Sequence, residues 1–125
     1  ELGRPLVTPE GKLKLGYLEA RRDWGYAKEY VEAMWLMLQN DAPKDYVIGT
    51  NSSYSVADAC RIAFAHAGLD WQTHVVSDTA LLRPTEITVL QGDYSLAQAE
   101  LGWQPRTSFE QLMQLMVEAD LDRFC

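Results

Sequence analysis

Hydrophobic side chains stand at alternate positions in the run KLKLGY, at Leu13, Leu15 and Tyr17. This alternation is typical of a half-buried β-strand. The preceding residues 1–11 contain two prolines and two glycines and show no period. They predict a loop or arm, so we expect the folded part of the chain to begin with a strand.

A helical pattern replaces the alternation from Tyr26 to Gln39. The spacing places five side chains on one face: Ala27, Tyr30, Val31, Met34 and Leu38. Residues 34–38, MWLML, are hydrophobic without interruption, which predicts a helix that is buried on more than one side. A small domain covers one such side, so we expect the other to contact another domain or subunit. We place Trp35 and Met37 at this contact and predict a homodimer through the helix.

Short strands and helices alternate in the remaining sequence. We expect strands or extended segments at residues 46–50, 69–76 and 87–93. We expect helices over residues 55–67 and 95–101 and after Thr107, each with a polar cap or a terminal glycine. Ser55 and Asp58 form an approximate capping box, as do Thr107 and Glu110. With about four helices, residues 1–125 are predicted to form one α/β domain.

Composition narrows the classes of partner. The chain has 125 residues and a net charge of −7, and such an acidic domain repels nucleic acids and anionic membranes. No hydrophobic run approaches the length of a membrane span. Cys60 and Cys125 fit neither a metal-binding spacing nor a disulfide framework. We therefore expect a protein of a reducing compartment, the cytoplasm, without nucleic acid or membrane as a partner.

The familiar catalytic motifs are absent from the sequence. It contains no glycine-rich dinucleotide fingerprint and no G-x-x-x-x-G-K phosphate loop. Ser52 and Ser53 lack a G-x-S-x-G context. His66 and His74 have no carboxylate or cysteine at ligand spacing, so no metal site is predicted. We assign no catalytic residue to this chain and expect it to bind no dinucleotide cofactor by itself.

Two arginine-containing stretches are the candidate binding residues. Arg22 and Asp23 lie between a predicted strand and a predicted helix, where ligand-binding loops of α/β proteins occur. Arg83 precedes Pro84, and Glu86 follows three residues after the arginine. A guanidinium suits phosphate oxygens, and a carboxylate can accept hydrogen bonds from neighbouring ribose hydroxyls. The residues alone leave two interpretations open, a nucleotide diphosphate site and ordinary exposed loop charge.

Two longer segments, LGYLEARRDWGYAKEYVEAMWLMLQ and RPTEITVLQGDYSLAQAELGWQP, resemble the C-terminal part of GDP-mannose 4,6-dehydratases. The resemblance extends over residues 13–121. These lyases are extended short-chain dehydrogenases/reductases with an NADP-binding Rossmann domain and a smaller substrate-binding domain. The resemblance implies that this chain is the second domain, without the Rossmann domain and its cofactor. It also implies that Arg22 and Arg83 contact the diphosphate of a nucleotide sugar such as GDP-mannose, and that Glu86 contacts the ribose.

The sequence departs from the family at two positions. Tyr17 stands where the family usually has asparagine, which leaves base specificity and the choice among dehydratase, reductase and epimerase open. Glu29 stands where aspartate is usual, which predicts a weakened helix start. We expect the chain to bind nucleotide sugar for a longer enzyme and not to catalyse alone. The alternative is a stand-alone, non-catalytic binding or interaction module derived from such a domain.

Overall fold

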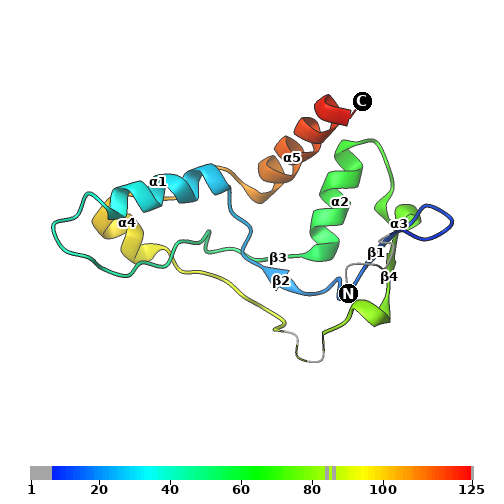
Figure 1. The fold of residues 1–125 in the computed structure, drawn as a ribbon, viewed down its shortest axis with the longest axis horizontal. Helices are drawn as coiled ribbons and strands as arrows, with labels where there is room; N and C mark the ends of the chain where they lie inside the picture. Colours follow the sequence, from blue (N-terminus) through cyan, green and yellow to red (C-terminus); the bar gives the residue numbers. More distant parts are fainter. Residues whose placement is uncertain (1–6, 84, 86, 125) are drawn as a thin grey trace.

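The computed structural model describes residues 7–83, 85 and 87–124. The described chain is elongated, with helices at both ends, a small sheet at one of these ends and a second small sheet between them (Figure 1). The strands are β1 (Leu13–Leu15), β2 (Arg21–Arg22), β3 (Tyr54–Ser55) and β4 (Val75–Ser77). The helices are α1 (Ala27–Met37), α2 (Val56–His66), α3 (Trp71–His74), η1 (Thr79–Leu81), α4 (Ser95–Leu101) and α5 (Phe109–Phe124). The predicted α/β class is confirmed.

Within the described residues, each of the two sheets has two regular strands. β1 pairs in parallel with β4, with Leu13 opposite Val75. β2 pairs with β3 in antiparallel orientation, and Arg21 also forms a parallel bridge to Val89. The second contact consists of Arg21 N donating to Thr88 O at 2.8 Å and Leu90 N donating to Arg21 O at 3.0 Å. The expected extended segment at residues 87–93 is thereby fixed against β2.

The structure corrects two of the expected strands. Residues 69–76 begin with the single turn α3, because the Asp70 side chain accepts a hydrogen bond from Gln72 N and caps it. Residues 46–50 form no regular strand. Among the described residues, the backbone at 45–49 has no hydrogen-bond partner. A hydrophobic, β-favouring sequence does not make a strand without a neighbouring strand to pair with.

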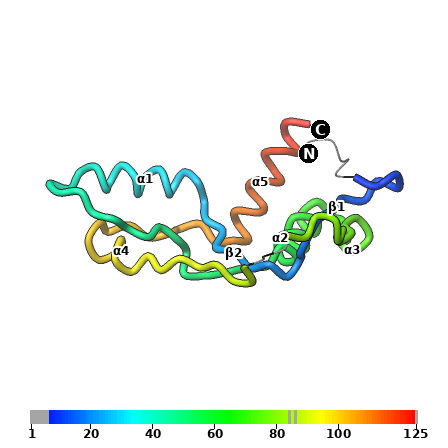
Figure 2. The backbone as a smooth tube through the Cα atoms, turned by 60° about the horizontal axis from the view of Figure 1, so that its bottom comes forward, coloured from blue at the N-terminus to red at the C-terminus, as the bar shows by residue number. Residues whose placement is uncertain are grey.

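The predicted helix at residues 26–39 is confirmed as α1, but the predicted buried face is wrong. Val31 and Met34 are 62% and 58% exposed, and Leu38, just after the helix, is 81% exposed. The face that is buried carries Ala33, which contacts Ala97 of α4 and Trp103 in one core cluster. Figure 2 shows α1 and α4 at the same end of the molecule. Because residues 34–38 are hydrophobic without interruption, the spacing of hydrophobic residues did not determine which side of α1 faces α4.

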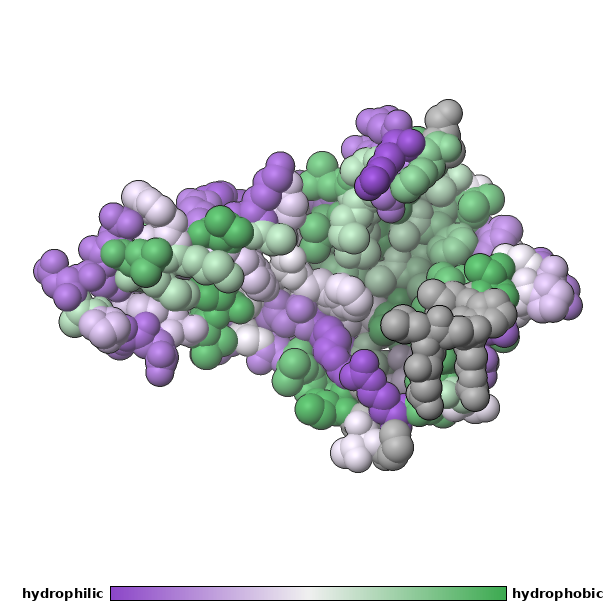
Figure 3. All heavy atoms as spheres, in the orientation of Figure 1, coloured by the Kyte–Doolittle hydropathy of each residue, from purple (hydrophilic) through white to green (hydrophobic). Residues whose placement is uncertain are grey.

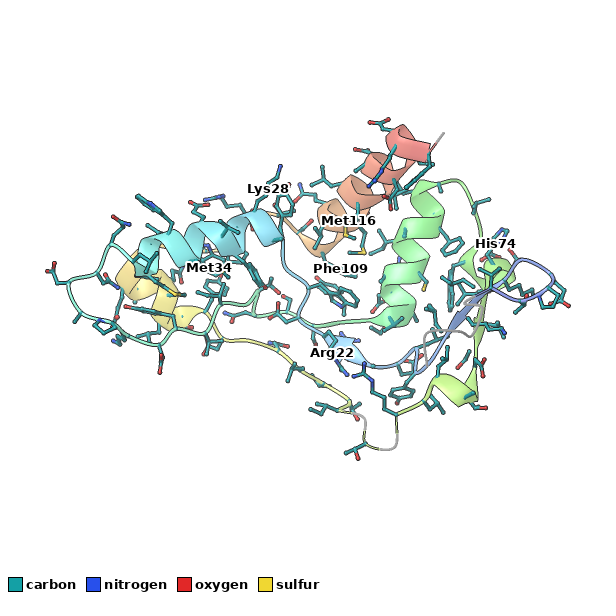
Figure 4. The ribbon with its side chains drawn as sticks, in the orientation of Figure 1. Arg22, Lys28, Met34, His74, Phe109 and Met116 are labelled. Carbon is teal, nitrogen blue, oxygen red and sulfur yellow. The ribbon has the colours of Figure 1, made fainter. Side chains whose placement is uncertain are left out.

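A second cluster holds the other end together. Phe109, Leu112 and Met113 of α5 are its buried residues, and side chains from β3 and α2 pack against them. Phe109 lies at the start of α5, facing the middle of the molecule (Figure 4). The Tyr54 ring stacks on the Phe109 ring with centroids 4.2 Å apart. The two clusters explain the two ends of the elongated fold, since each end has its own hydrophobic contacts.

Glu29 connects the two clusters through a buried carboxylate. Its Oε1 accepts a hydrogen bond from Thr107 Oγ1 at 2.7 Å, and its Oε2 accepts one from Arg106 N at 3.2 Å. Its backbone oxygen accepts one from Trp103 Nε1 at 2.8 Å. The carboxylate therefore holds the segment that leads from α4 into α5. This role differs from the weakened helix start that we expected of a glutamate here.

Capping was predicted correctly for α2 and wrongly for α5. Ser55 and Asp58 form a complete capping box at the start of α2. At α5, Ser108 and Gln111 form the reciprocal pair, because Ser108 N donates to Gln111 Oε1 and Gln111 N donates to Ser108 Oγ. Thr107 was the expected cap, but its hydroxyl is bonded to Glu29. Gly102 ends α4 in the left-handed conformation, with φ of 67°, as its position after the helix predicts.

Asp23 joins three separate stretches of chain. Both carboxylate oxygens accept from Thr50 N, at 3.0 and 2.8 Å, and Oδ1 also accepts from Thr50 Oγ1 at 2.8 Å. Oδ2 accepts from Gly92 N at 3.0 Å. Gly49 and Gly92 allow this approach, because a Cβ on Gly49 would lie 2.8 Å from Gly92 Cα and 2.9 Å from Asp23 Oδ2. The segment after β2 is thus held to residues 50 and 92.

We predict that Asp23→Asn lowers the free energy of unfolding by about 1.5–3 kcal/mol, the range for hydrogen bonds to a charged group. The amide would place a donor against Thr50 N or Gly92 N, both of which are donors. Urea denaturation of the chain measures the change. Asp45→Asn is the matched control, because it makes the same substitution at an exposed aspartate. Equal stability of the two variants would contradict the role given to Asp23.

Candidate functional site

The structure brings the two candidate arginines into one pocket of about 290 Å³, which we call the arginine pocket. Its lining includes Leu15, Tyr17, Arg22, Trp24, Leu81 and Arg83. No carboxylate is among its described lining residues. Glu86, the third predicted site residue, lies outside the residues that the structure describes. The pocket brings two guanidinium groups together in a chain whose net charge is −7.

The wall that carries Arg83 is positioned by the end of the parallel sheet. At the end of β1, Leu15 O accepts a hydrogen bond from Asp78 N at 2.7 Å, and Gly16 O accepts one from Ser77 Oγ at 2.9 Å. These bonds set η1 beside residue 16. A Cβ on Gly16 would lie 2.9 Å from Leu81 O, so the close approach requires glycine. Arg83 follows η1 by two residues and is exposed at the rim.

The opposite wall is formed by β2 and the residue pair that follows it. Arg22 Nη1 donates to Ile87 O at 2.7 Å and to Arg21 O at 2.8 Å, which ties the guanidinium to the segment leading away from Arg83. Arg22 is half-buried on β2, below Phe109 in Figure 4. A half-buried, hydrogen-bonded guanidinium loses less freedom on binding an anion than an exposed one.

The residues flanking Asp23 face the pocket, and Asp23 does not line it. Successive side chains of an extended segment point to opposite sides, which explains why Arg22 and Trp24 share the pocket. Trp24 is fixed from behind, because its Nε1 donates to Tyr54 O at 3.0 Å and its ring lies 5.9 Å from that of Phe109. The R-D-W sequence therefore combines a ligand-facing arginine, a structural aspartate and an anchored indole.

Sequence reasoning identified Arg22 and Arg83 but overlooked the aromatic part of the site. Tyr17, one of the two departures from the family, lies in the pocket lining. Trp24 was not singled out as a site residue, although the two-residue alternation after β2 would have placed it beside Arg22. Leu15 and Leu81 could not be found from spacing, because they meet through the pairing of β1 with β4.

A second pocket, of about 340 Å³, lies where the two ends of the molecule meet and includes Trp24, Tyr54, Tyr94 and Arg106 in its lining. Its cation is already paired, since Arg106 forms an ion pair with Glu32. The hydroxyl of Thr107, another lining residue, is bonded to Glu29. In the second pocket, Arg106 and Thr107 are therefore engaged by two carboxylates of α1.

Neither histidine contributes to the arginine pocket. His66 Nε2 lies 3.1 Å from Glu118 Oε1, and the His74 ring stacks on Phe64. Within residues 7–83, 85 and 87–124, no three histidine, cysteine, aspartate or glutamate side chains are grouped as metal ligands. In the same part of the chain, no helix is long and hydrophobic enough to cross a bilayer.

Sequence comparison gives one consistent family. A sequence model described as GDP-mannose 4,6 dehydratase matches residues 4–116. GDP-mannose 4,6 dehydratase 1 of Arabidopsis thaliana is 48% identical over 121 residues, which are 97% of this chain and 34% of that protein. The GDP-mannose 4,6 dehydratase of Homo sapiens is 44% identical over 125 residues, covering 86% of this chain and 34% of that protein. The chain thus spans about a third of the length of these curated relatives.

Solved structures show the same fold at lower identity. A UDP-glucose 4-epimerase from Thermotoga maritima, solved with UDP-glucose, superposes with a TM-score of 0.81 at 23% identity, over 91% of this chain and 36% of that chain. A dTDP-glucose 4,6-dehydratase from Bacillus anthracis, solved with NAD, gives a TM-score of 0.79 at 18% identity, over 92% and 36%. With the family match covering nearly its whole length, the chain belongs to the GDP-mannose 4,6-dehydratase family.

Proposed function

We propose that the arginine pocket binds the diphosphate of a nucleotide sugar, of the GDP-mannose type, and that the chain supplies the substrate-binding part of a GDP-mannose 4,6-dehydratase-like enzyme. The observation that carries the proposal is the meeting of Arg22 and Arg83 in one pocket. Membership of a family named for its action on GDP-mannose supports the choice of ligand.

A diphosphate fits this pocket because of charge and geometry. Each guanidinium can donate two parallel hydrogen bonds to oxygens of one phosphoryl group. Arg22 comes from the β2 wall and Arg83 from the segment after η1, so the two can approach adjacent phosphates from different sides. For Glu86 we propose the ribose hydroxyls as ligands, on the basis of the family resemblance.

In the longer enzyme, we assign this part to binding and orientation. Holding the sugar in a fixed place lowers the barrier to a reaction performed by groups elsewhere. NADP, which accepts and returns a hydride in such chemistry, is assigned to another part of the enzyme, because this sequence contains no glycine-rich phosphate loop. We infer a cytoplasmic location, which is supported by two cysteines that match no disulfide framework.

A further proposal concerns assembly. We propose that the chain self-associates as a two-fold homodimer through the exposed side of α1. Val31, Met34 and Trp35 of α1 are 62%, 58% and 60% exposed, which supports a hydrophobic contact there. Figure 3 shows hydrophobic side chains on the visible surface at the α1 end as well as at the opposite end. Met37, which the sequence placed at this contact, packs instead against the cluster of Ala33 and Trp103 and is not part of the proposed dimer contact.

Arg83→Ala is expected to weaken GDP binding about tenfold or more. Loss of a charge-assisted hydrogen bond costs about 1.5–3 kcal/mol, and each 1.4 kcal/mol is a factor of ten. Isothermal titration calorimetry measures the affinity. Arg123→Ala is the matched control, since it removes the same charge from an exposed position at the end of α5. An unchanged affinity for GDP in Arg83→Ala would remove this residue from the site and with it the proposed function.

Trp35→Glu is expected to convert the homodimer into a monomer, because it places a charge in the centre of the proposed hydrophobic contact. Light scattering at micromolar concentration measures the mass. Gln72→Glu serves as the control, since it adds the same charge on exposed α3 at the other end of the molecule. A monomeric mass for the unaltered chain would refute the homodimer.

A further inference from the structure

Tyr17 is an exposed aromatic residue in the lining of the arginine pocket. The residue is 40% exposed, although it lines the pocket with both arginines. Trp24, the other aromatic residue in the lining, packs its ring against Phe109. Tyr17 has no comparable ring contact within the described part of the chain. One face of this pocket therefore offers an unused aromatic surface.

The backbone around Tyr17 is held on both sides, so the position of its ring is restricted. Before it, Gly16 is bonded through its oxygen to Ser77 Oγ and lies against Leu81. After it, Ala20 N donates to Tyr17 O at 3.4 Å, which closes the turn toward β2. A ring on such a restrained backbone costs less entropy to immobilise than one on a free loop.

The pocket lining contains hydrophobic residues that binding of a phosphate group alone would not require. Arg22 and Arg83 supply the positive charge, but Leu15 and Leu81 provide hydrophobic surface next to Tyr17. Inorganic pyrophosphate would leave that surface unused. A nucleoside diphosphate would use both parts, because a nucleobase has flat faces that stack on aromatic side chains and two phosphates that pair with guanidinium groups.

We propose that the Tyr17 ring is the platform on which the nucleobase stacks, so that the pocket selects nucleoside diphosphates over anions that have phosphates alone. The inference rests on the proposed function of the arginine pocket. Stacking uses the face of the ring, so the phenol oxygen is not required. Because every base has such a face, Tyr17 confers preference for a nucleotide without by itself choosing among bases.

The test compares GDP with inorganic pyrophosphate by calorimetry for the unaltered chain and for Tyr17→Ala, Tyr17→Phe and Arg83→Ala. Tyr17→Ala is expected to weaken GDP binding about tenfold, within the range found for loss of one base–aromatic stack. Its pyrophosphate affinity is expected to stay unchanged, which also shows that the pocket is still folded. Tyr17→Phe is expected to keep the original affinity for both ligands.

The outcomes distinguish the stacking role of Tyr17 from the proposed diphosphate binding in the arginine pocket. If Arg83→Ala weakens binding of both ligands but Tyr17→Ala leaves GDP affinity unchanged, the diphosphate site stands and the stacking role of Tyr17 is refuted. Equal losses of GDP and pyrophosphate affinity in Tyr17→Ala would also refute stacking, because the residue would then act only on the shape of the pocket. If neither ligand binds the unaltered chain, or Arg83→Ala changes neither affinity, the diphosphate site is refuted and the role of Tyr17 with it.

Discussion

The Asp23 carboxylate is the interaction on which the geometry of the site depends. It accepts hydrogen bonds from Thr50 and Gly92, so the segment after β2 is held to two stretches that are distant in sequence. Because alternate residues of an extended segment point to opposite sides, fixing Asp23 inward turns Arg22 and Trp24 toward the other side. A charged residue that touches no ligand in our account thus determines where the ligand-facing arginine lies.

Contacts between side chains from distant segments also connect the site to the two ends of the molecule. Trp24 joins the arginine pocket to the Phe109 cluster of α5 through its ring and to Tyr54 through its indole nitrogen. Glu29 joins α1 to the segment before α5 through a carboxylate that is only 5% exposed. These polar contacts compensate for two small and separate hydrophobic clusters. In a chain this elongated, side-chain hydrogen bonds across segments supply order that one larger core would otherwise provide.

Local signals in the sequence were sufficient for α1, α2, α4 and α5, the Ser55–Asp58 box and the αL glycine at position 102. The resemblance supplied Arg22 and Arg83, and the structure brings them together. The predictions that were wrong concerned features set by contacts with residues far away in the sequence. The buried side of α1 was chosen by contact with Trp103, not by the uniform MWLML run. The run at 46–50 has strand-like residues but, in the part of the chain that the structure describes, no strand pairs with it. The hydroxyl of Thr107 is engaged by Glu29, far away in the sequence.

The central claim, that Arg22 and Arg83 together hold a diphosphate, is tested most directly by NMR of the arginine Nε–H groups during titration with GDP. The account predicts that the Arg22 and Arg83 resonances shift together and saturate with one affinity. The resonances of Arg61 and Arg123, which lie outside the pocket lining, should stay in place. A shift centred on Arg106, which lines the second pocket, with Arg22 and Arg83 unmoved would contradict the account.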